Sequence, residues 1–412
     1  MEEYTMNAGD TAFILLCAAF VFIMTPGLAF FYGGMVRRKN VGNTMMQCVF
    51  IMGVSVIMWV LVGYALSFGG NHAGIIGGAK WFGFNGVGMK PGPYADTIPN
   101  LAFAAFQMMF AMITPALITG SVAGRMKFKA LVLFIILWSL IVYYPMAHMV
   151  WGEDGFLAAL GSVDFAGGNV VHISSGVSAL VLAICLGRRR GYEHTSYRIH
   201  NIPFVTLGAS LLWFGWFGFN AGSGLCADGI AANAFLVTHL ATCVAALTWM
   251  AIDWIYNKKP TTVGACTGAV SGLVAITPAA GSTGILGAFF IGLITPIVCF
   301  YMVAVIKPKL KYDDTLDAFG VHGVGGIIGS ILTGVFATRF ITGEEGAEGA
   351  LYGDWHQLWI QVAATLISIV FSAVMTYLLF KVTDRMIGIR VDKRVEEEGL
   401  DIYEHGESAY NR

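Results

Sequence analysis

Long stretches without Asp, Glu, Lys or Arg dominate this chain and predict helices that cross a membrane. About 20 consecutive apolar residues span the hydrocarbon core of a bilayer. The stretch at 260–306 is too long for one helix and contains the helix-breaking segment Pro278-Ala279-Ala280-Gly281, so we expect two spans there and eleven in all. The stretches cover 11–36, 40–79, 97–124, 130–152, 155–187, 199–227, 229–252, 260–306, 315–338 and 355–380, interrupted only by Asp164 and Asp317.

Composition supports the same class of protein. Hydrophobic residues make up 57% of the 412 residues and charged residues only 12%, whereas soluble domains carry about 25% charged residues. The net charge of -1 leaves no basic surplus for a phosphate backbone, so nucleic acid is not an expected partner. The 52 glycines suit close contacts between membrane helices. We therefore predict an all-α membrane protein.

Cysteine spacing and the N-terminal residues exclude several other classes. The seven cysteines are scattered and form no CxxC pair, which argues against a disulfide framework and against a zinc site. We expect no metal and no cofactor. The first ten residues carry Glu2, Glu3 and Asp10 but no Lys or Arg, unlike a cleaved secretory signal, so we expect the first helix to remain in the protein.

The distribution of cations predicts the orientation. If the N-terminus is outside and eleven spans follow, 21 of the 24 Lys and Arg residues fall on one side, leaving Lys80, Lys90 and Arg339 on the other. By the positive-inside rule the richer side is cytoplasmic, so the C-terminus is inside. We expect one transmembrane domain at 1–387, in the cytoplasmic (inner) membrane of the cell, and a cytoplasmic tail at 388–412. Its helices 1–5 cover about 11–187, helices 6–10 about 199–338, and a long eleventh helix about 355–387.

Two acidic residues precede two histidines at the same spacing in the two halves of the chain. Asp164 lies eight residues before His172, and Asp314 lies eight residues before His322. If both pairs lie on helices that enter from opposite sides, helices 1–5 and 6–10 form an inverted 5+5 repeat, which places a substrate path near the membrane midplane. Eight residues of helix rise about 12 Å, so we expect both histidines to be buried near that midplane.

A buried histidine has two interpretations. It can hydrogen-bond a neighbouring helix and hold the bundle together, which is the usual role of a single buried histidine. Two histidines at symmetric positions can instead face each other, share one proton, and still offer a donor and an acceptor to a passing molecule. Ionisable groups inside a membrane commonly belong to functional sites, and both interpretations stay open at this stage.

Characteristic glycine-rich and aromatic segments recur along the whole chain. They are Pro26-Gly27-Leu28-Ala29-Phe30-Phe31-Tyr32-Gly33-Gly34, Ala147-His148-Met149-Val150-Trp151-Gly152, Asp164-Phe165-Ala166-Gly167-Gly168, Gly215-Trp216-Phe217-Gly218-Phe219-Asn220-Ala221-Gly222-Ser223, Phe319-Gly320-Val321-His322-Gly323 and, in the tail, Glu398-Gly399-Leu400-Asp401 with His405-Gly406-Glu407. Together they strongly resemble the ammonium transporter family (Amt/Mep/Rh), in its prokaryotic Amt branch. The resemblance implies an eleven-helix bundle with a pore in each protomer of a homotrimer.

The resemblance also implies roles for individual residues. It makes Trp151 and Ser223, with Phe110, an external recruitment site for ammonium, and Asp164 the essential aspartate below it. It makes Phe110 and Phe219 a stacked gate, with Phe106 and Trp216 nearby, and His172 and His322 the pore and proton relay. Each residue also has a structural interpretation: Trp151 as a membrane-interface residue, the phenylalanines as core, Ser223 as a helix end, and Asp164 as a helix N-cap.

The difference between ammonium and potassium suggests a mechanism. The two ions have the same charge and similar size, but only ammonium can lose a proton. Moving an ion to the bilayer centre costs from about 2.5 to over 10 kcal/mol, while removing a proton costs about 1.4 kcal/mol per unit of pKa mismatch. We therefore expect ammonium to be deprotonated outside and ammonia to pass a hydrophobic twin-histidine pore, with the proton transferred separately, so that transport is electrogenic.

Other functions stay open. One alternative is a passive ammonia channel of the Rh type, and another is an ammonium sensor or transceptor. Methylammonium is a possible second substrate, and a PII-type regulatory protein is an open partner at the cytoplasmic face, besides membrane lipid. No nucleophile or metal-ligand set accompanies the histidines, so we do not expect an enzyme.

Three residues depart from the pattern of the family. Glu153 and Asp154 follow Trp151-Gly152 where many members carry glycines, and Asn169 occupies a position where Thr or Ser is usual. The acidic pair either enriches cations at the mouth of the pore or forms a solvated turn, and we favour the turn.

Overall fold

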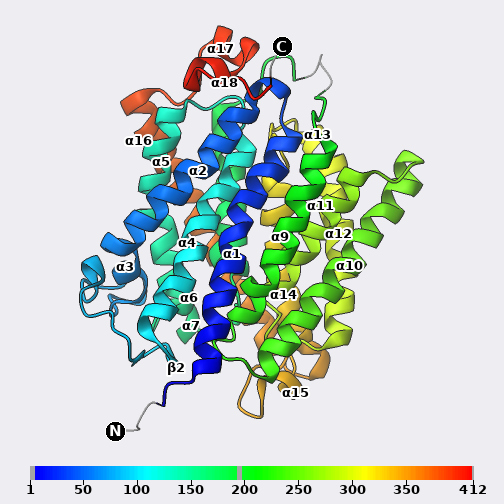
Figure 1. Ribbon diagram of the computed structural model, residues 1–412. Coiled ribbons are helices and arrows are strands. Elements are labelled where there is room, and N and C mark those ends of the chain that lie inside the picture. Colours follow the sequence, from blue (N-terminus) through cyan, green and yellow to red (C-terminus); the bar gives the residue numbers. More distant parts are fainter. Residues whose placement is uncertain (1–4, 193–196, 411–412) are drawn as a thin grey trace.

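The computed structural model describes residues 5–192 and 197–410 and is built mainly from helices, arranged side by side along one axis (Figure 1). Within these residues ten helical segments are long and apolar enough to cross a membrane, and α11 is a shorter apolar helix of 15 residues. The helices of the bundle are α1 (Ala8–Met35), α2 (Val41–Met58) continued by α3 (Tyr64–Phe68), α4 (Asn100–Val122), α5 (Phe128–Trp138) continued by α6 (Tyr144–Trp151), η5 (Gly168–Ile173) with α8 (Ser174–Leu186), α9 (Ile202–Gly222), α10 (Gly229–Asn257), α11 (Thr262–Ile276), α12 (Ile285–Tyr301) continued to α13 (Lys307–Leu310), η7 (Phe319–Gly323) with α14 (Val324–Phe336), and α16 (Trp355–Ile387).

Short elements complete the chain. They are the helices α7 (Phe156–Ala159), α15 (Arg339–Thr342), α17 (Lys393–Glu398) and α18 (Leu400–His405), the 3-10 turns at Arg38–Asn40, Phe82–Phe84 and Ala350–Tyr352, and the antiparallel strands β1 (Pro91–Gly92) and β2 (Ala95–Pro99). Five spans contain a π-helical turn, at Trp59–Gly63, Ser139–Tyr143, Gly168–Ile173, Met302–Ile306 and Phe319–Gly323. A π-helical turn is a widened turn that often occurs at functional sites.

The structure confirms one predicted helix break and corrects two expected boundaries. The long apolar stretch at 260–306 divides where predicted, since α11 ends at Ile276 and α12 begins at Ile285. The apolar stretch at 40–79 is not all helix: α3 ends at Phe68, and the chain continues as a loop that contains the two strands. The stretch at 155–187 begins with the single turn α7, and its long helical segment starts at Gly168. Apolar composition alone does not distinguish a helix from an apolar loop.

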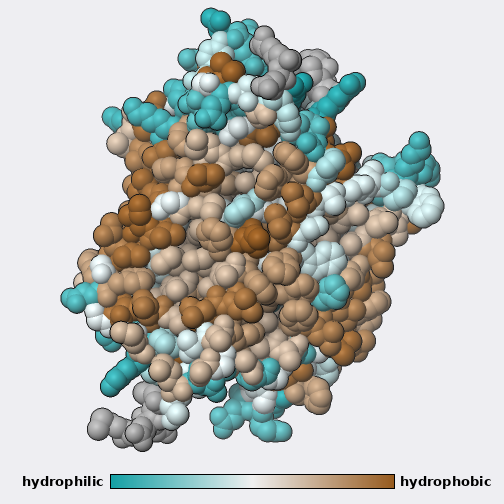
Figure 2. Space-filling model, viewed as in Figure 1, coloured by the Kyte–Doolittle hydropathy of each residue, from teal (hydrophilic) through white to brown (hydrophobic). Residues whose placement is uncertain are grey.

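The surface has an apolar belt between two polar ends. Figure 2 shows brown hydrophobic side chains over the middle of the bundle and teal hydrophilic side chains at both ends. Large hydrophobic side chains are exposed on many helices, including Phe22, Leu61, Phe214, Leu247 and Leu366. Such a belt is what a helical membrane protein presents to lipid.

The C-terminal tail packs on the bundle at the end opposite the start of α1 (Figure 1). α2 begins without a capping bond from the side chain of Asn40, the residue before it. Its first amides instead donate to the tail, from Gly42 N to Asp401 Oδ2 at 3.0 Å and from Asn43 N to Asp401 Oδ1 at 2.8 Å. Asn40 Oδ1 in return accepts from Leu400 N at 3.0 Å. The tail therefore supplies the N-cap of a helix near the other end of the sequence. Glu2, Glu3 and the last two residues of the predicted tail lie outside the described residues.

Candidate functional site

The two histidines that the sequence singled out lie side by side in the core. Nδ1 of His322 lies 3.4 Å from Nδ1 of His172, and the two rings are nearly parallel, with centroids 5.4 Å apart. Both side chains are buried, at 1% and 3% exposure. Nε2 of His172 has no hydrogen-bond partner among the described residues. The pair therefore couples the two halves of the chain and leaves a ring nitrogen available to another molecule.

Each histidine occupies a π-helical turn that begins just after an acidic residue. The Asp164 carboxylate accepts from the amides of Gly167 at 2.9 Å and Asn169 at 2.7 Å, and also from Gly168 N and Val170 N. The Asp314 carboxylate accepts from Ala318 N at 3.1 Å and Phe319 N at 2.8 Å. Both acids accept from the first amides of their helical segments, although the N-cap positions themselves are Gly167 and Ala318, so the matching sequence spacing corresponds to matching local structure.

The expectation that eight residues of helix separate each acid from its histidine is wrong. The first helical segment starts at Gly168, after Gly167 has turned the chain with φ 118°, and the second starts at Phe319. Each histidine therefore lies within the first five residues of its helical segment.

A close contact between two glycines lets the histidine-bearing helices approach each other. A Cβ atom added at Gly176 would lie 2.1 Å from Gly323 N and 2.4 Å from Gly323 Cα. Real Cβ contacts are never this short, so any larger residue would separate the helices. The absence of a side chain here is what allows the two rings to lie within hydrogen-bonding range.

A row of buried aromatic rings leads from Trp151 to the histidines. The Phe110 ring lies 5.8 Å from the Trp151 ring, edge to face, and 4.4 Å from the Phe219 ring, tilted by 39°. The Phe219 ring in turn lies 6.1 Å from the His172 ring. Phe106 contacts Phe110 at 5.0 Å, and Trp216 stacks on His172 at 5.3 Å. The structure thus brings the predicted gate residues together, with the two phenylalanine rings in tilted rather than parallel contact.

Hydrogen bonds fix the polar ends of this row. Trp151 Nε1 donates to the carbonyl oxygen of Asp164 at 2.9 Å, which connects the outermost ring to the capping acid. Ser223 Oγ donates to the carbonyl oxygen of Phe219 at 2.9 Å, so its own lone pairs can accept from a ligand. Both side chains are half-buried, whereas the rings of the gate are fully buried.

The three residues that depart from the family pattern have different surroundings. Glu153 and Asp154 are exposed, and Asp154 adopts a left-handed φ of 56°, so the pair forms a surface turn. Asn169 is buried, and neither polar atom of its side chain finds a partner within the described part of the chain. Its backbone amide nevertheless donates to Asp164.

A cavity of about 210 Å³ opens below His322. Its walls include Asp317 together with Tyr32, Arg189 and Lys307, and sequence reasoning did not place the last three near the histidines. Lys307 Nζ pairs with the Asp317 carboxylate and donates to the carbonyl oxygen of Asp314 at 3.0 Å. Burial raises the pKa of the Asp314 carboxyl to about 6, with Asp317 adding to the rise and Lys307 opposing it. Lys307 and Asp317 belong to the charged segment between α12 and η7, whereas Tyr32 lies on α1 and Arg189 in the loop after α8, so no single sequence signal connected them.

Sequence reasoning also missed Thr277, whose Oγ1 accepts a 2.8 Å hydrogen bond from Trp216 Nε1. Thr277 directly precedes the helix-breaking proline. A hydroxyl at the end of a broken membrane helix is the signal that could have pointed to it.

A bundle of apolar helices with a buried aromatic and histidine row through its core, bounded by half-buried polar side chains, defines a helical membrane transport protein. Comparison with known proteins specifies the class. The family model described as Ammonium Transporter Family matches residues 12–410, and the chain belongs to that family.

Similar proteins cover the chain over its whole length. An ammonium transporter of Bacillus subtilis is 49% identical, with 98% of this chain and 99% of the relative aligned. One of Aquifex aeolicus is 47% identical, over 100% of this chain and 95% of the relative. The crystal structure of Saccharomyces cerevisiae Mep2 matches with a TM-score of 0.88 and 34% identity, covering 95% of this chain and 89% of that one.

Proposed function

We propose that this protein takes up ammonium across the cytoplasmic membrane by moving ammonia and a proton separately. The observation that carries the proposal is the buried histidine pair at the end of the aromatic row, in a chain of the ammonium transporter family. The path is lined by carbon and ring atoms, which suit an uncharged molecule. A bare cation held there would lack the oxygen ligands that replace its hydration shell.

Recruitment takes place at the half-buried end of the row. The Trp151 ring attracts a cation by about 0.5–2 kcal/mol, and the Ser223 hydroxyl, whose proton is committed to Phe219, accepts an N–H from ammonium. Phe110 contacts the Trp151 ring and closes the path below it. Asp164 holds the carbonyl that orients Trp151, and its carboxylate adds negative potential nearby.

Ammonium loses its proton near Asp164, and ammonia then passes between Phe110 and Phe219 to the histidine pair. Nε2 of His172, which has no protein partner within the described residues, is the first ring atom available to it. The proton follows through water and the two imidazoles and rejoins ammonia on the far side. Potassium has no proton to give up and is excluded.

The topology is part of the same proposal. Eleven crossings, counting α11, place the tail and 21 of the 24 cations on the cytoplasmic side, with the N-terminus outside. The chain is then one transmembrane domain at 1–387 with a tail at 388–412. The matching caps of η5 and η7 support the inverted 5+5 repeat. The homotrimer, a PII-type partner, bound lipid and methylammonium as a second substrate remain predictions from the family resemblance.

The test is the transient current of reconstituted protein on a solid-supported membrane after a jump in ammonium, with potassium as the control ion. Electrogenic transport predicts an inward positive current for ammonium and none for potassium. His172→Ala and His322→Ala should each abolish the ammonium current or admit potassium. Unchanged current and selectivity in both variants would refute the relay, and internal alkalinisation without current would instead support the passive ammonia channel.

A further inference from the structure

A second cavity lies away from the histidine path, between the tail and the loops at the same end of the bundle. It encloses about 280 Å³. Its walls come from the loops that follow α1, α4 and α8 and from the tail helix α17. The charged residues that line it are five cations and two carboxylates: Arg37, Lys39, Arg125, Arg189, Arg190, Glu396 and Glu397.

Among the described residues, these two carboxylates and Asp313, which pairs with Arg125 and Arg189, do not balance the five cations. Glu396 already accepts from Arg390, which does not line the cavity, with 2.9 Å between Arg390 Nη2 and Glu396 Oε2. It also accepts from the backbone amide of Arg190 at 2.7 Å. Glu397 is exposed, and its carbonyl oxygen accepts from Lys39 Nζ. The cavity therefore keeps an excess of positive charge, and a recess lined by one sign of charge concentrates counter-ions.

Two residues that line the cavity each have a buried guanidinium nitrogen without a hydrogen-bond partner within the described residues: Nε of Arg125 and Nη1 of Arg189. Other nitrogens of the same two side chains have partners. Arg125 Nη2 donates to the carbonyl oxygen of Asp313 at 2.6 Å, and Arg189 Nη2 pairs with Asp313 Oδ1 at 3.0 Å. A buried N–H without an acceptor is costly, so these nitrogens are suited to an acceptor that enters the cavity.

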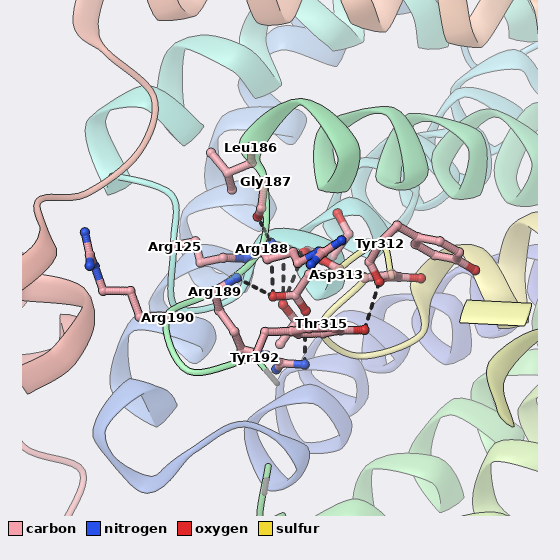
Figure 3. Close-up of polar contacts among 12 residues, drawn as sticks. Arg125, Leu186, Gly187, Arg188, Arg189, Arg190, Tyr192, Tyr312, Asp313 and Thr315 are labelled. Atoms are coloured by element: carbon pink, nitrogen blue, oxygen red, sulfur yellow. Dashed lines mark hydrogen bonds and ion pairs between the residues drawn. The ribbon is translucent and has the colours of Figure 1, made fainter. Parts of the chain in front are cut away.

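Figure 3 shows the geometry of this cluster. The side chains of Arg125 and Arg189 converge on Asp313, while Arg190 points away from it, toward the tail. Burial lowers the pKa of the Arg125 guanidinium, Asp313 opposes that shift, and Arg189 and Arg390 add to it. An additional anion near Arg125 would relieve the repulsion among these arginines.

We propose that this cavity binds a soluble phosphate group, either inorganic phosphate or the phosphate of a small cytosolic molecule. Arginine donors and phosphate oxygens form paired, charge-assisted hydrogen bonds. The lining residues belong to loops and to α17, and the tail helices lie at the end of the bundle (Figure 1), which favours a soluble ligand over a lipid headgroup.

The position of the cavity gives its ligand a consequence for the pore. Arg189 and Tyr197 line both this cavity and the one below His322. The Arg189 guanidinium lies over the Tyr197 ring, 4.1 Å from its centroid. A bound phosphate would hold Arg189, Tyr197 and α17 in place. Because Arg189 and Tyr197 also line the cavity below His322, the concentration of cytosolic phosphate would then affect the exit of the path.

The test measures binding and does not depend on transport. The protein is placed in phosphatidylcholine nanodiscs, and binding of radiolabelled inorganic phosphate is measured while chloride keeps the ionic strength constant. We expect saturable binding at one site per chain. Arg190→Gln, which retains the backbone amide bound to Glu396, and Arg37→Gln should each weaken it about tenfold or more, as expected for losing one charge-assisted hydrogen bond. Lys259→Gln, in a loop away from the cavity, should leave binding unchanged.

Three results would overturn the proposal. The first is an absence of saturable phosphate binding by the unaltered protein. The second is equal binding by Arg190→Gln, Arg37→Gln and the control, in variants whose tail is as resistant to protease as that of the unaltered protein. The third is saturable binding of labelled phosphatidic acid in the nanodiscs that inorganic phosphate does not displace, which would assign the site to a lipid headgroup.

Discussion

Replacing Asp313 by asparagine should destabilise the protein strongly. Asp313 is fully buried, and its side chain faces Arg189 Nη2 at 3.0 Å and Arg125 Nη1 at 3.4 Å. Arg125 is also fully buried. Asp313→Asn keeps the size of the side chain but removes the only carboxylate that forms an ion pair with these two arginines among the described residues, so two cations are left together in a poorly solvated place.

The expected cost follows from these distances. At an effective dielectric constant of about 20, unit charges 3.4 Å apart attract by about 5 kcal/mol. Part of that attraction offsets the desolvation of the ions, and breaking a buried pair by removing one partner costs about 3–5 kcal/mol. The loss of stability should approach the upper end of this range, because Asp313 pairs with two arginines, which repel each other once the carboxylate is removed.

The measurement is the free energy of unfolding in mixed micelles, from an SDS titration followed by tryptophan fluorescence. Arg394→Gln is the matched control, because it breaks the Arg394–Glu398 pair in the tail, whose side chains are 77% and 49% exposed. Exposed pairs contribute about 0–1 kcal/mol. If Asp313→Asn is as stable as Arg394→Gln, the Arg125–Asp313–Arg189 cluster does not hold the loops together and the electrostatic reasoning fails.

Three further predictions concern the site and the tail. Asp164→Ala removes the acceptor of four backbone amides. The variant should lose about 0.5–2 kcal/mol of stability and carry no ammonium current. A normal current would contradict the role proposed for Asp164. Gly176→Ala should destroy transport because its methyl group would collide with Gly323. In the control Gly53→Ala nothing lies within 4 Å of the added methyl group, so that variant should be neutral or stabilised by about 1 kcal/mol. Equal transport activity of the two variants would show that the helices can separate without loss of transport. Burial lowers the pKa of His200, whose Nε2 lies 2.8 Å from Tyr410 Oη in the tail. The folded state then binds fewer protons than the unfolded state, so tail docking should weaken as the pH falls from about 7 to about 5. Faster proteolysis of the tail at low pH would show this, and His200→Gln should remove the pH dependence.

Local sequence patterns predicted what depends on local structure. The helix break near Pro278 and the equal spacing of the two acid–histidine pairs are both properties of a few consecutive residues, and each has a counterpart in the fold. The start of the helix at Gly168 was missed because Gly167 turns the chain first, and an apolar stretch does not reveal such a turn.

Contacts between distant segments could not be predicted from one sequence. Phe110 and Phe219 lie on different helices, α4 and α9, and no sequence pattern connects their positions. Only the family resemblance predicted their contact. Arg125 and Asp313 are 188 residues apart and looked like ordinary loop charges. Burial converts such charges into a structural cluster, and burial is a property of the complete fold.

The bond between Asp401 and the start of α2 has a consequence for biosynthesis. A ribosome makes α2 long before it makes Asp401, so the first amides of α2 have no cap from the tail while most of the chain is being inserted. Only a chain that has been translated through its tail can complete this end of the bundle. Molecules shortened by premature termination or by a protease would expose the uncapped amides at the start of α2. Cellular quality control could use these amides to distinguish incomplete chains from complete ones.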